Sequence, residues 1–491
     1  MTDLTLLLDA RRMKAQAARR RTPMQRALYE ALRDAIAQNR LQAGAVLPAT
    51  RELARDLVMA RNGVIHAYEQ LAAEGYVQTS RQGTVVAALG ARPGLPPRLR
   101  AGRQAPDIDL AARVQGYDRR RAPDDDLRPF MPGMPALDAF PLAAWRRLCD
   151  RAARQGGPDD LGYRHSVGEP ELRQAIATYL RAARGVRCEV EQVTVTDGTQ
   201  HSLALCAQML ADAGDTVWME HPGYGAARTA LALAGLNVVP VTVDAEGIAP
   251  PDAWWQAKPP RLIYTTPSHQ YPLGSVLTLP RRLHLIERAR AAGAWILEDD
   301  YDSEFRHDGP PLAAMQGQAD DAPVVYLGTF SKSMFPALRL GFIVWPQALA
   351  DRAAGVIGHL VRRGRTVEQR ALASFIDEGQ FTSHLRKMRR LYAIRQAALR
   401  DALATHWPLP ATVLGGQAGM HLVLSLPSSG RQAVSDLDVA QAAYERGLSP
   451  RPLSMYGTGG VEGFNGLVMG YANTHEDRMA HFVQVMACAS R

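Results

Sequence analysis

The chain has 491 residues, a length that predicts two to four domains. Hydrophobic residues make up 46% of it and charged residues 22%, which is typical of a soluble globular protein with a large core. No stretch approaches the length of a membrane span, and the apolar run at residues 4–8 is too short for a signal peptide. These features exclude membrane-spanning and secreted classes, and we expect a cytoplasmic protein without membrane contact.

The net charge of +8 is unevenly distributed. Residues 1–103 contain 17 Lys and Arg against 8 Asp and Glu, a net charge of +9, whereas the remainder carries −1. A positive excess confined to the first fifth predicts that this part meets a polyanion. A basic tail with a solvated face is the alternative. The four cysteines, Cys149, Cys188, Cys206 and Cys488, show no paired spacing, so neither a zinc site nor a disulfide framework is expected.

The first ninety residues show the pattern of a small DNA-binding domain. Apolar residues at helical spacing predict a helix within 22–39, followed by a short helix over 51–57 capped by Thr50. A third helix is expected over 61–74, ended by Gly75, and residues 76–79 and 84–87 alternate around a turn as in a hairpin. Three helices and a hairpin predict an α+β winged helix-turn-helix domain over 22–90, after an N-terminal extension of residues 1–21.

Five residues of this domain are candidates for contact with DNA. In a helix-turn-helix the second helix enters the major groove through its first residues, which here are Arg61 and Asn62. Arg51, at the start of the preceding helix, would approach a phosphate or a guanine edge. Arg81 and Gly83, at the hairpin tip, would reach the minor groove or the backbone. For any single arginine, a solvated helix face is the alternative.

The same segment resembles the GntR family of winged-helix regulators. The matching residues are Leu-Pro-Ala-Thr-Arg-Glu-Leu-Ala at 47–54, Ala-Arg-Asn at 60–62 and Tyr-Glu-Gln-Leu-Ala-Ala-Glu-Gly-Tyr at 68–76. The resemblance implies a double-stranded DNA operator as the partner.

Beyond this domain the composition changes twice. Residues 91–127 are rich in Pro, Gly, Arg and Asp with little periodicity, which predicts a linker. Residues 128–491 alternate β-rich apolar runs with helical stretches, which predicts an α/β domain with a mainly parallel sheet. The expected strands are 193–196, 216–219, 262–264, 295–297 and 324–327.

Lys332 is the most informative single residue of this second domain. It follows a predicted buried strand and the small hydroxylated residues Thr329 and Ser331. A partly desolvated lysine is neutral and nucleophilic at modest cost, as Schiff-base chemistry requires. The two hydroxyls and the Arg339 guanidinium would hold a phosphate beside it.

Three further runs carry groups suited to the same site. Free amides of Thr199 and Gln200, where a strand turns into the helix 201–210, would form a phosphate seat. Tyr224 follows a strand and could stack on a flat heteroaromatic ring, although core packing would explain it equally. Asp299 lies in a carboxylate-rich strand end, where one carboxylate can pair with a protonated ring nitrogen. A surface turn or a metal cluster is the alternative there.

Together these runs resemble the fold-type I pyridoxal-phosphate aminotransferases over roughly residues 128–491. Supporting matches are Tyr163 with Gly-Glu-Pro-Glu-Leu-Arg at 168–173, and Thr-Pro-Ser-His-Gln-Tyr-Pro-Leu-Gly at 266–274. With the GntR-like segment on the same chain, the whole resembles the MocR/GabR/PdxR group of regulators.

The resemblance implies a cofactor, pyridoxal 5'-phosphate (PLP), and a role for each candidate residue. Lys332 would form an aldimine with it, Asp299 would pair with the ring nitrogen, and Tyr301 would approach the ring hydroxyl. Tyr224 would stack, and Tyr163 would reach across from the second subunit of a homodimer. The implied phosphate contacts are Thr199, Gln200, Thr329, Ser331 and Arg339.

Two departures from the aminotransferase pattern bear on function. Tyr271 stands where these enzymes carry an asparagine that contacts the ring hydroxyl, which leaves His269 or Gln270 as replacements. Val468 stands where they carry the arginine that binds the substrate carboxylate, so an α-amino acid would be poorly held. Arg451 could serve instead, though a salt bridge would explain it at least as well.

The sequence therefore predicts a PLP-dependent transcriptional regulator that uses Lys332 for sensing rather than turnover. Its small-molecule effector is PLP itself, in control of vitamin B6 genes, or an amine or amino acid that reacts with bound PLP. A working aminotransferase with an accessory DNA-binding arm is the main alternative, and a GntR-like binder without a cofactor is another.

Overall fold

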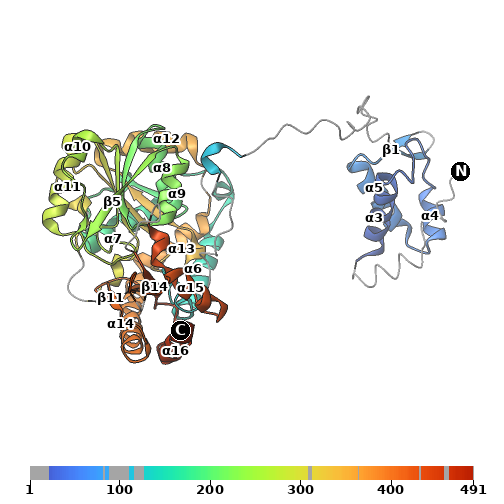
Figure 1. Ribbon diagram of the computed structural model, residues 1–491. Helices are drawn as coiled ribbons and strands as arrows, with labels where there is room; N and C mark the ends of the chain where they lie inside the picture. Colours follow the sequence, from blue (N-terminus) through green and yellow to red (C-terminus); the bar gives the residue numbers. More distant parts are fainter. Residues whose placement is uncertain are drawn as a thin grey trace, which may run out of the picture. The chain divides into compact units, whose positions relative to one another are not determined.

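The computed structural model describes residues 22–80, 83–87, 110–115, 127–307, 312–362, 364–430, 433–457 and 464–489. The chain divides into two compact units, residues 1–109 and residues 110–491. We call them unit 1 and unit 2 and describe each by itself (Figure 1). Within the described ranges, no helix has the length and apolar character needed to cross a bilayer.

Unit 1 has the predicted winged helix-turn-helix elements. They are α3 (Met24–Ala37), α4 (Thr50–Asp56), α5 (Arg61–Ala73), β1 (Val77–Ser80) and β2 (Gly83–Val86). The two strands form an antiparallel hairpin in which Val77 pairs with Val86. Leu28, Leu32 and Leu71 are fully buried where the helices meet, so their helical spacing identified the core-facing sides correctly.

The cap predicted for the second helix is wrong. Thr50 is the first residue of α4, and Ala49 precedes the helix without a side-chain cap. The Thr50 hydroxyl instead accepts a hydrogen bond of 3.4 Å from Nε of Arg61 at the start of α5. Thr50 therefore links the two helices of the helix-turn-helix rather than closing one of them.

Unit 2 is built on an eight-stranded sheet with the order β3-β10-β9-β8-β7-β4-β5-β6. Its strands are β3 (Val193–Thr196), β4 (Thr216–His221), β5 (Asn237–Asp244), β6 (Gly247–Ile248), β7 (Leu262–Thr265), β8 (Trp295–Asp300), β9 (Val324–Thr329) and β10 (Gly341–Val344). Only β10 and β6 run antiparallel to their neighbours. The predicted mainly parallel α/β fold is confirmed, and all five predicted strands are present.

Helices cover both faces of this sheet. Leu203 of α8 (Thr199–Leu210), Leu231 of α9 (Gly225–Leu233) and Ile357 of α12 (Ala350–Leu360) pack on one face. Ile286 of α11 (Leu279–Ala292) and Trp255 of α10 (Trp254–Ala257) pack on the other. With both faces buried, the central strands are almost continuously apolar, as their sequences suggested.

A smaller antiparallel sheet completes unit 2, with the order β11-β12-β14-β13. Its strands are β11 (Thr412–Leu414), β12 (His421–Ser425), β13 (Arg451–Pro452) and β14 (Gly466–Gly470). The remaining helices are α6 (Leu142–Gln155), α7 (Pro170–Arg184), α13 (Thr366–Asp377), α14 (Gln380–His406), α15 (Asp436–Glu445) and α16 (Met479–Ala489).

Most of the predicted linker, residues 91–127, lies outside the described residues. Within it the structure describes residues 110–115, which include the 3-10 turn η1 (Ala112–Val114), and residue 127. The domain boundaries expected from the sequence therefore stay predictions.

Candidate cofactor site and nucleic-acid interface

The carboxyl ends of several strands meet at one edge of the large sheet. Gly341, the first residue of β10, pairs with Thr196 at the end of β3 and with Thr329 at the end of β9. The turn from β3 into α8 and the turn after β9 are therefore neighbours. Ligands of open α/β sheets bind at this kind of edge, outside the carboxyl ends of the strands.

The turn into α8 is positively polarised. Thr199 and Gln200 are the first two residues of α8, so their backbone amides have no acceptor within the helix. Gly198 precedes them with a left-handed φ of +92°, and the Arg339 guanidinium carbon lies 3.5 Å from the position that a Cβ on Gly198 would take. A helix N-terminus beside a guanidinium is a strong site for a phosphate.

Two hydroxyls lie at and just after the end of β9. The Thr329 hydroxyl donates to Oγ of Ser331 over 3.2 Å and accepts from the Ser331 amide over 3.2 Å. Arg339 follows with a left-handed φ of +51°, and its carbonyl accepts a hydrogen bond of 3.1 Å from Nη1 of Arg365. The five residues predicted to hold a phosphate thus come from two adjoining segments.

Lys332 directly follows these hydroxyls. Its amine donates a hydrogen bond of 2.8 Å to the carbonyl of Gly133. Gly133 has a left-handed φ of +72°, and a Cβ there would come within 2.8 Å of the Lys332 amine. A side chain at position 133 would therefore displace the amine. Sequence reasoning did not identify Gly133, because nothing local marks it.

Asp299 presents one unpaired oxygen close to this lysine. Its side chain is 3% exposed, Oδ2 accepts a hydrogen bond of 2.7 Å from Tyr264, and Oδ1 is buried without a partner. Burial raises the pKa of Asp299 to about 7, while the Tyr264 hydrogen bond and the Lys332 charge act to lower it. A buried carboxylate with one free oxygen is suited to pair with a protonated heterocyclic nitrogen.

The neighbouring aspartate has different partners. Asp300 accepts hydrogen bonds from Arg184 at 2.8 Å and from the Tyr326 hydroxyl at 2.5 Å. Successive residues of a strand point to opposite faces, so Asp300 belongs to a buried ion pair away from Asp299. The alternative of a metal cluster built from both aspartates does not match these partners.

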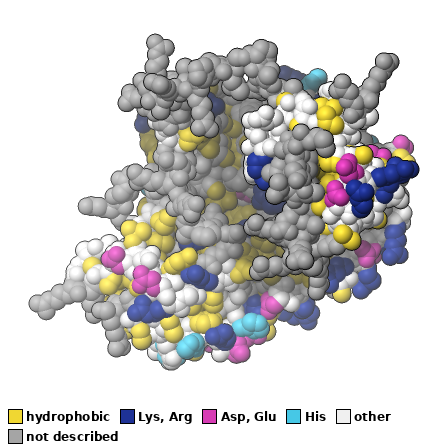
Figure 2. All heavy atoms as spheres, turned by 90° about the vertical axis from the view of Figure 1, so that its right-hand side faces the viewer, with side chains coloured by type: hydrophobic (Ala, Val, Ile, Leu, Met, Phe, Trp, Pro, Cys, Tyr) yellow, Lys and Arg dark blue, Asp and Glu magenta, His cyan; other side chains and the backbone are white. Residues whose placement is uncertain are grey.

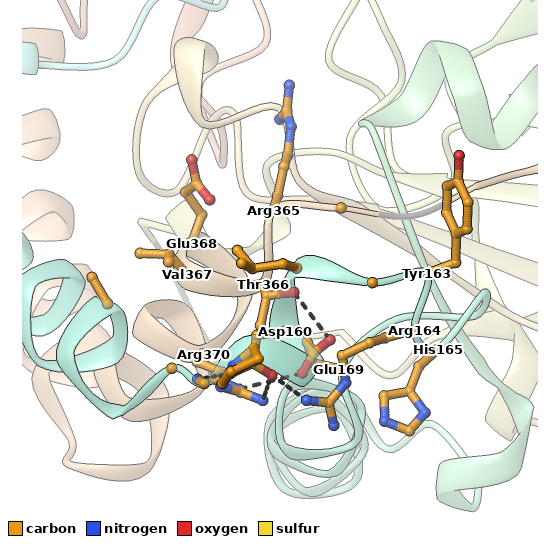
Figure 3. A pocket seen from close by; sticks show the side chains of 17 residues that line it. Asp160, Tyr163, Arg164, His165, Glu169, Arg365, Thr366, Val367, Glu368 and Arg370 are labelled. Atoms are coloured by element: carbon orange, nitrogen blue, oxygen red, sulfur yellow. Dashed lines mark hydrogen bonds and ion pairs between the residues drawn. The ribbon is translucent and has the colours of Figure 1, made fainter.

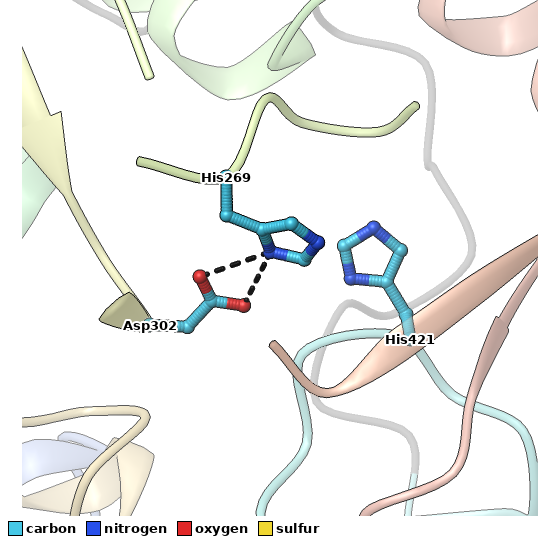
Figure 4. A group of neighbouring side chains, drawn as sticks. All are labelled: His269, Asp302 and His421. Carbon is cyan, nitrogen blue, oxygen red and sulfur yellow. Dashed lines mark hydrogen bonds and ion pairs between the residues drawn. The ribbon is translucent and has the colours of Figure 1, made fainter. Parts of the chain in front are cut away.

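Tyr301 contacts His269. His269 forms a buried cluster with Asp302 and His421 (Figure 4). The Tyr301 hydroxyl lies 3.0 Å from Nδ1 of His269, and the two rings stack at 6.0 Å between centroids. Nδ1 of His269 also lies 3.0 Å from Oδ2 of Asp302. Asp302 and His421 were not among the predicted residues, although Asp302 stands in the same acidic run as Asp299.

The two replacements considered for the missing asparagine differ in their surroundings. The Gln270 amide nitrogen donates to the carbonyls of Pro222 and Tyr271 at 2.9 and 2.8 Å, so backbone contacts occupy it. His269 instead contacts Tyr301. His269 is therefore the better placed of the two to influence a ring hydroxyl.

Tyr224 belongs to an aromatic group centred on Tyr271. The Tyr271 ring lies 5.8 Å from the rings of Tyr224 and Tyr301 and 5.3 Å from that of Tyr456. The hydroxyls of Tyr271 and Tyr456 are 2.9 Å apart. The stacking role of Tyr224 stays a prediction, and its edge contact with Tyr271 shows that packing also involves it.

The expected carboxylate-binding position is apolar. Val468 is fully buried on β14 and packs with Val423 and Leu453. Arg451, the alternative cation, pairs with Val468 across β13 and β14. The backbone of the small sheet thus places Arg451 next to the position where an arginine is missing.

Tyr163 lines a hollow that includes none of the other predicted cofactor residues (Figure 3). This hollow has a volume of about 930 Å³ and is bordered by Asp160, Arg370 and the first turn of α13. Asp160 and Arg370 are paired at 2.8 Å. Tyr163 is 85% exposed, and the Arg362 guanidinium lies 5.6 Å from its ring centre. Its predicted role in a second subunit stays untested.

The described DNA-contact candidates lie on the surface of unit 1. Arg61 and Asn62 are the first residues of α5, Arg51 is the second residue of α4, and all three are exposed. Gly83 begins β2 and is exposed, whereas Arg81 lies outside the described residues. Figure 2 shows basic, acidic and apolar side chains interspersed on the face in view.

Two family models match the chain, in the order that the two units have. Residues 24–86 match "Bacterial regulatory proteins, gntR family", and residues 137–485 match "Aminotransferase class I and II". Among solved structures, the LysN α-aminoadipate aminotransferase of Thermus thermophilus, complexed with N-(5'-phosphopyridoxyl)-L-leucine, has a TM-score of 0.66 and 27% identity. That likeness covers 76% of this chain and 96% of the other.

Full-length relatives combine both regions. The probable rhizopine catabolism regulatory protein MocR of Rhizobium meliloti is 43% identical over 88% of this chain and 87% of its own. The pyridoxine biosynthesis transcriptional regulator PdxR of Corynebacterium glutamicum is 32% identical over 92% of each. With a GntR-type unit joined to an aminotransferase-type unit, the chain belongs to the MocR/GabR/PdxR group of GntR-family transcriptional regulators.

Proposed function

We propose that unit 2 binds PLP covalently at Lys332, and that either PLP itself or an amine or amino acid that reacts with it is the signal that changes operator binding by unit 1. PLP supplies an aldehyde that condenses with amines and a ring that withdraws electrons. The observation that carries the proposal is the unpaired, buried Oδ1 of Asp299 near Lys332, because an oxygen left without a partner at this depth calls for a ligand.

Different residues would bind the phosphate, the ring nitrogen and the ring hydroxyl of PLP. Thr199, Gln200, Thr329, Ser331 and Arg339 would bind the phosphate, and Asp299 would hold the ring nitrogen in its protonated form. Tyr301 would face the ring hydroxyl. This donor set matches an anionic phosphate at one end and a basic nitrogen at the other.

Sensing rather than turnover is supported by the apolar surroundings of Val468. An α-amino acid substrate needs a fixed cation for its carboxylate, and the small sheet buries a valine among other apolar side chains at that position. PLP itself is therefore favoured as the signal over an amino acid. We also propose that the protein acts as a homodimer.

Footprinting of the purified protein on genomic DNA, with and without PLP, tests the function. We expect a protected operator whose affinity changes roughly 5- to 150-fold with PLP, the range of typical allosteric coupling. Linkage requires that saturating operator change the affinity for PLP by the same factor. Operator binding that is identical with and without PLP, together with equal PLP affinities in both titrations, would contradict the sensing role.

Transamination is the second candidate, and the intact pair of Lys332 and Asp299 favours it. A 2-aminoadipate transaminase of Thermus thermophilus is also 29% identical over 72% of this chain. Continuous turnover of amino donors, measured with the full-length protein, would establish this activity. A single round of amino-group transfer, which stops after one equivalent of donor per protein, would instead fit a sensor.

A further inference from the structure

Asp302 and His421, which form a buried cluster with His269 (Figure 4), have no role in the site described so far. His269 and Asp302 are both 1% exposed at their side chains, so their contacts form without competition from water. Nδ1 of His269 is 3.0 Å from Oδ2 and 3.1 Å from Oδ1 of Asp302, and 3.0 Å from the Tyr301 hydroxyl.

Burial raises the pKa of Asp302, and the contact with His269 acts to lower it. In the ionised form of Asp302, these contacts determine which nitrogen of His269 carries the proton. An ionised carboxylate can only accept hydrogen bonds, so Nδ1 of His269 carries a hydrogen that it donates to Asp302. The same holds for a neutral imidazole and for an imidazolium. A protonated Nδ1 has no lone pair, so the Tyr301 hydroxyl cannot donate to it. Tyr301 faces Nδ1 through its oxygen, and its hydrogen is left to point elsewhere.

His421 fixes the other side of the cluster. Its Nε2 lies 2.9 Å from the carbonyl of Pro272, which can only accept, so this nitrogen carries the hydrogen of a neutral ring. Burial, together with His269, lowers the pKa of His421 to about 3. Nε2 of His269 is buried without a partner. His421 therefore contributes no positive charge to compete for Asp302.

Packing holds His269 in this orientation. A Cβ at Gly419, whose φ is +85°, would overlap Cε1 of His269. A Cβ at Gly274 would approach its Nε2 to 3.3 Å. The imidazole is enclosed by backbone on both sides, so it has little freedom to turn away from Asp302.

We propose that His269, oriented by Asp302, is a positioning residue that directs the Tyr301 hydroxyl proton toward the ring oxygen of PLP. The inference rests on the proposed binding of PLP at Lys332. Tyr301 would then donate a hydrogen bond to an oxygen that becomes negatively charged, and this bond would stabilise the deprotonated form of the bound chromophore. His269 acts only through Tyr301.

A metal ion in the cluster is the competing assignment. The three side chains could each offer one ligand atom, and these atoms lie within 4.8 Å of one another. An ion bound through the Asp302 carboxylate would compete with the contact that Asp302 makes with Nδ1 of His269. The arrangement is better suited to fixing a tautomer than to holding an ion.

The test is the pH titration of the visible absorbance of the PLP-loaded, full-length protein. Loss of a hydrogen bond to a charged oxygen should raise the chromophore pKa by about 1–2 units in Tyr301→Phe. Asp302→Asn should give most of the same rise without touching PLP, because an amide lets His269 adopt the other tautomer. The groups that face Tyr301 or His269 and also titrate or carry charge are Asp299, Lys332, Glu220, Tyr271, Asp302 and His421.

Matched variants separate orientation from general damage. His269→Asn keeps a donor near the position of Nδ1 and should retain the unmodified pKa, whereas His269→Leu should raise it. His421→Gln keeps a donor for the Pro272 carbonyl and should leave the pKa unchanged. The amount of bound chromophore, measured for each variant, shows that the site remains folded.

Three results would overturn the inference. The first is a chromophore pKa that is raised in Tyr301→Phe but unchanged in Asp302→Asn. The second is an equal rise of the chromophore pKa in His421→Gln. The third is a change in the chromophore pKa of the unmodified protein on treatment with a chelator, which would indicate a metal site. If the unmodified protein forms no coloured species with PLP, the proposed function fails instead.

Discussion

The Tyr264 hydroxyl donates a hydrogen bond of 2.7 Å to Oδ2 of Asp299 and leaves Oδ1 free. Tyr264 lies on β7 and Asp299 on the adjacent strand β8. The tyrosine thereby orients the carboxyl and opposes the rise in its pKa that burial causes. This contact therefore affects both the orientation of the free oxygen and the pKa of the carboxyl.

Tyr264→Phe should weaken PLP binding about tenfold at pH 7, because hydrogen bonds to charged groups contribute about 1.5–3 kcal/mol. Without the hydroxyl, the pKa of Asp299 rises further above about 7, so less carboxylate is available to the protonated ring nitrogen. PLP titration of the cofactor-free protein, followed by absorbance, measures the change. The loss should diminish as the pH is raised, since Asp299 then ionises even without the tyrosine.

Tyr326→Phe is the control, because Tyr326 makes the same kind of contact to Asp300 on the other side of β8. It should leave PLP affinity within about twofold, although it removes a hydrogen bond from the buried pair of Asp300 and Arg184. Equal losses in the two variants would mean that general damage to the sheet, rather than the Asp299 contact, sets the affinity.

Arg61→Ala should weaken operator binding by about 1–3 kcal/mol and relax specificity at one base position. Arg61 is the first residue of α5 and is exposed for contact with a base edge. Arg33→Ala is the control. Arg33 contacts Tyr29, and the Tyr29 hydroxyl donates a hydrogen bond to Glu74. Glu74 lies just beyond the C-terminal end of α5, about 20 Å along the helix from Arg61. The affinity of Arg61→Ala, measured on operator and on random DNA, should fall more on the operator. Equal losses of affinity on the two DNAs would mean that Arg61 contacts only phosphate.

The apolar runs in the sequence predicted where the strands lie, but they did not predict where each strand ends. β8 was expected to stop at Leu297 and continues to Asp300, because Glu298 is buried and bonded to the amides of Met315 and Gln316. Polar residues at a strand end look like a turn when their partners lie elsewhere in the sequence. The same reason explains why Thr50 seemed to be a cap.

Within the candidate site, the sequence allowed residues in recognisable runs to be proposed, and it did not point to isolated residues. Lys332, Asp299 and Arg339 follow strands whose pattern is visible in the sequence. Gly133 and His421 carry no local signal, since only the folded chain brings them to the lysine and to His269. Long-range contacts of single residues are set by tertiary packing, which single-sequence patterns do not record.

His384→Leu should make the folded protein less sensitive to acid. His384 is 6% exposed on α14, and burial lowers its pKa from 6.5 to about 4. In the unfolded chain His384 binds a proton below about pH 6.5, whereas in the folded chain it does so only near pH 4. The free energy of unfolding is therefore not reduced by His384 above pH 6.5, and it falls as the pH is lowered from 6.5 to 4. The loss is about 3 kcal/mol. Urea unfolding at pH 7 and pH 4 measures it.

A packing change without a titrating group gives the comparison. Met388→Leu, one turn further along α14, should shift the free energy of unfolding by a similar amount at both pH values. If His384→Leu behaves in the same way, with no recovery of stability at pH 4, then other groups dominate the acid response.

Val58→Gly should stabilise unit 1 by about 1 kcal/mol. Val58 lies in the turn between α4 and α5, has a left-handed φ of +49° and is 72% exposed, so no buried contact offsets the strain. A left-handed backbone costs an L-residue about 1–2 kcal/mol, and the freedom that glycine adds to the unfolded chain offsets part of the stabilisation.

Asn39 has a similar φ of +57°, but asparagine tolerates this region, so Asn39→Gly should bring little or no gain in stability. Hydrogen exchange of the α3 and α5 amides in the full-length protein measures both variants. A gain in Asn39→Gly as large as that in Val58→Gly would show that the β-branched side chain is not the source of the strain.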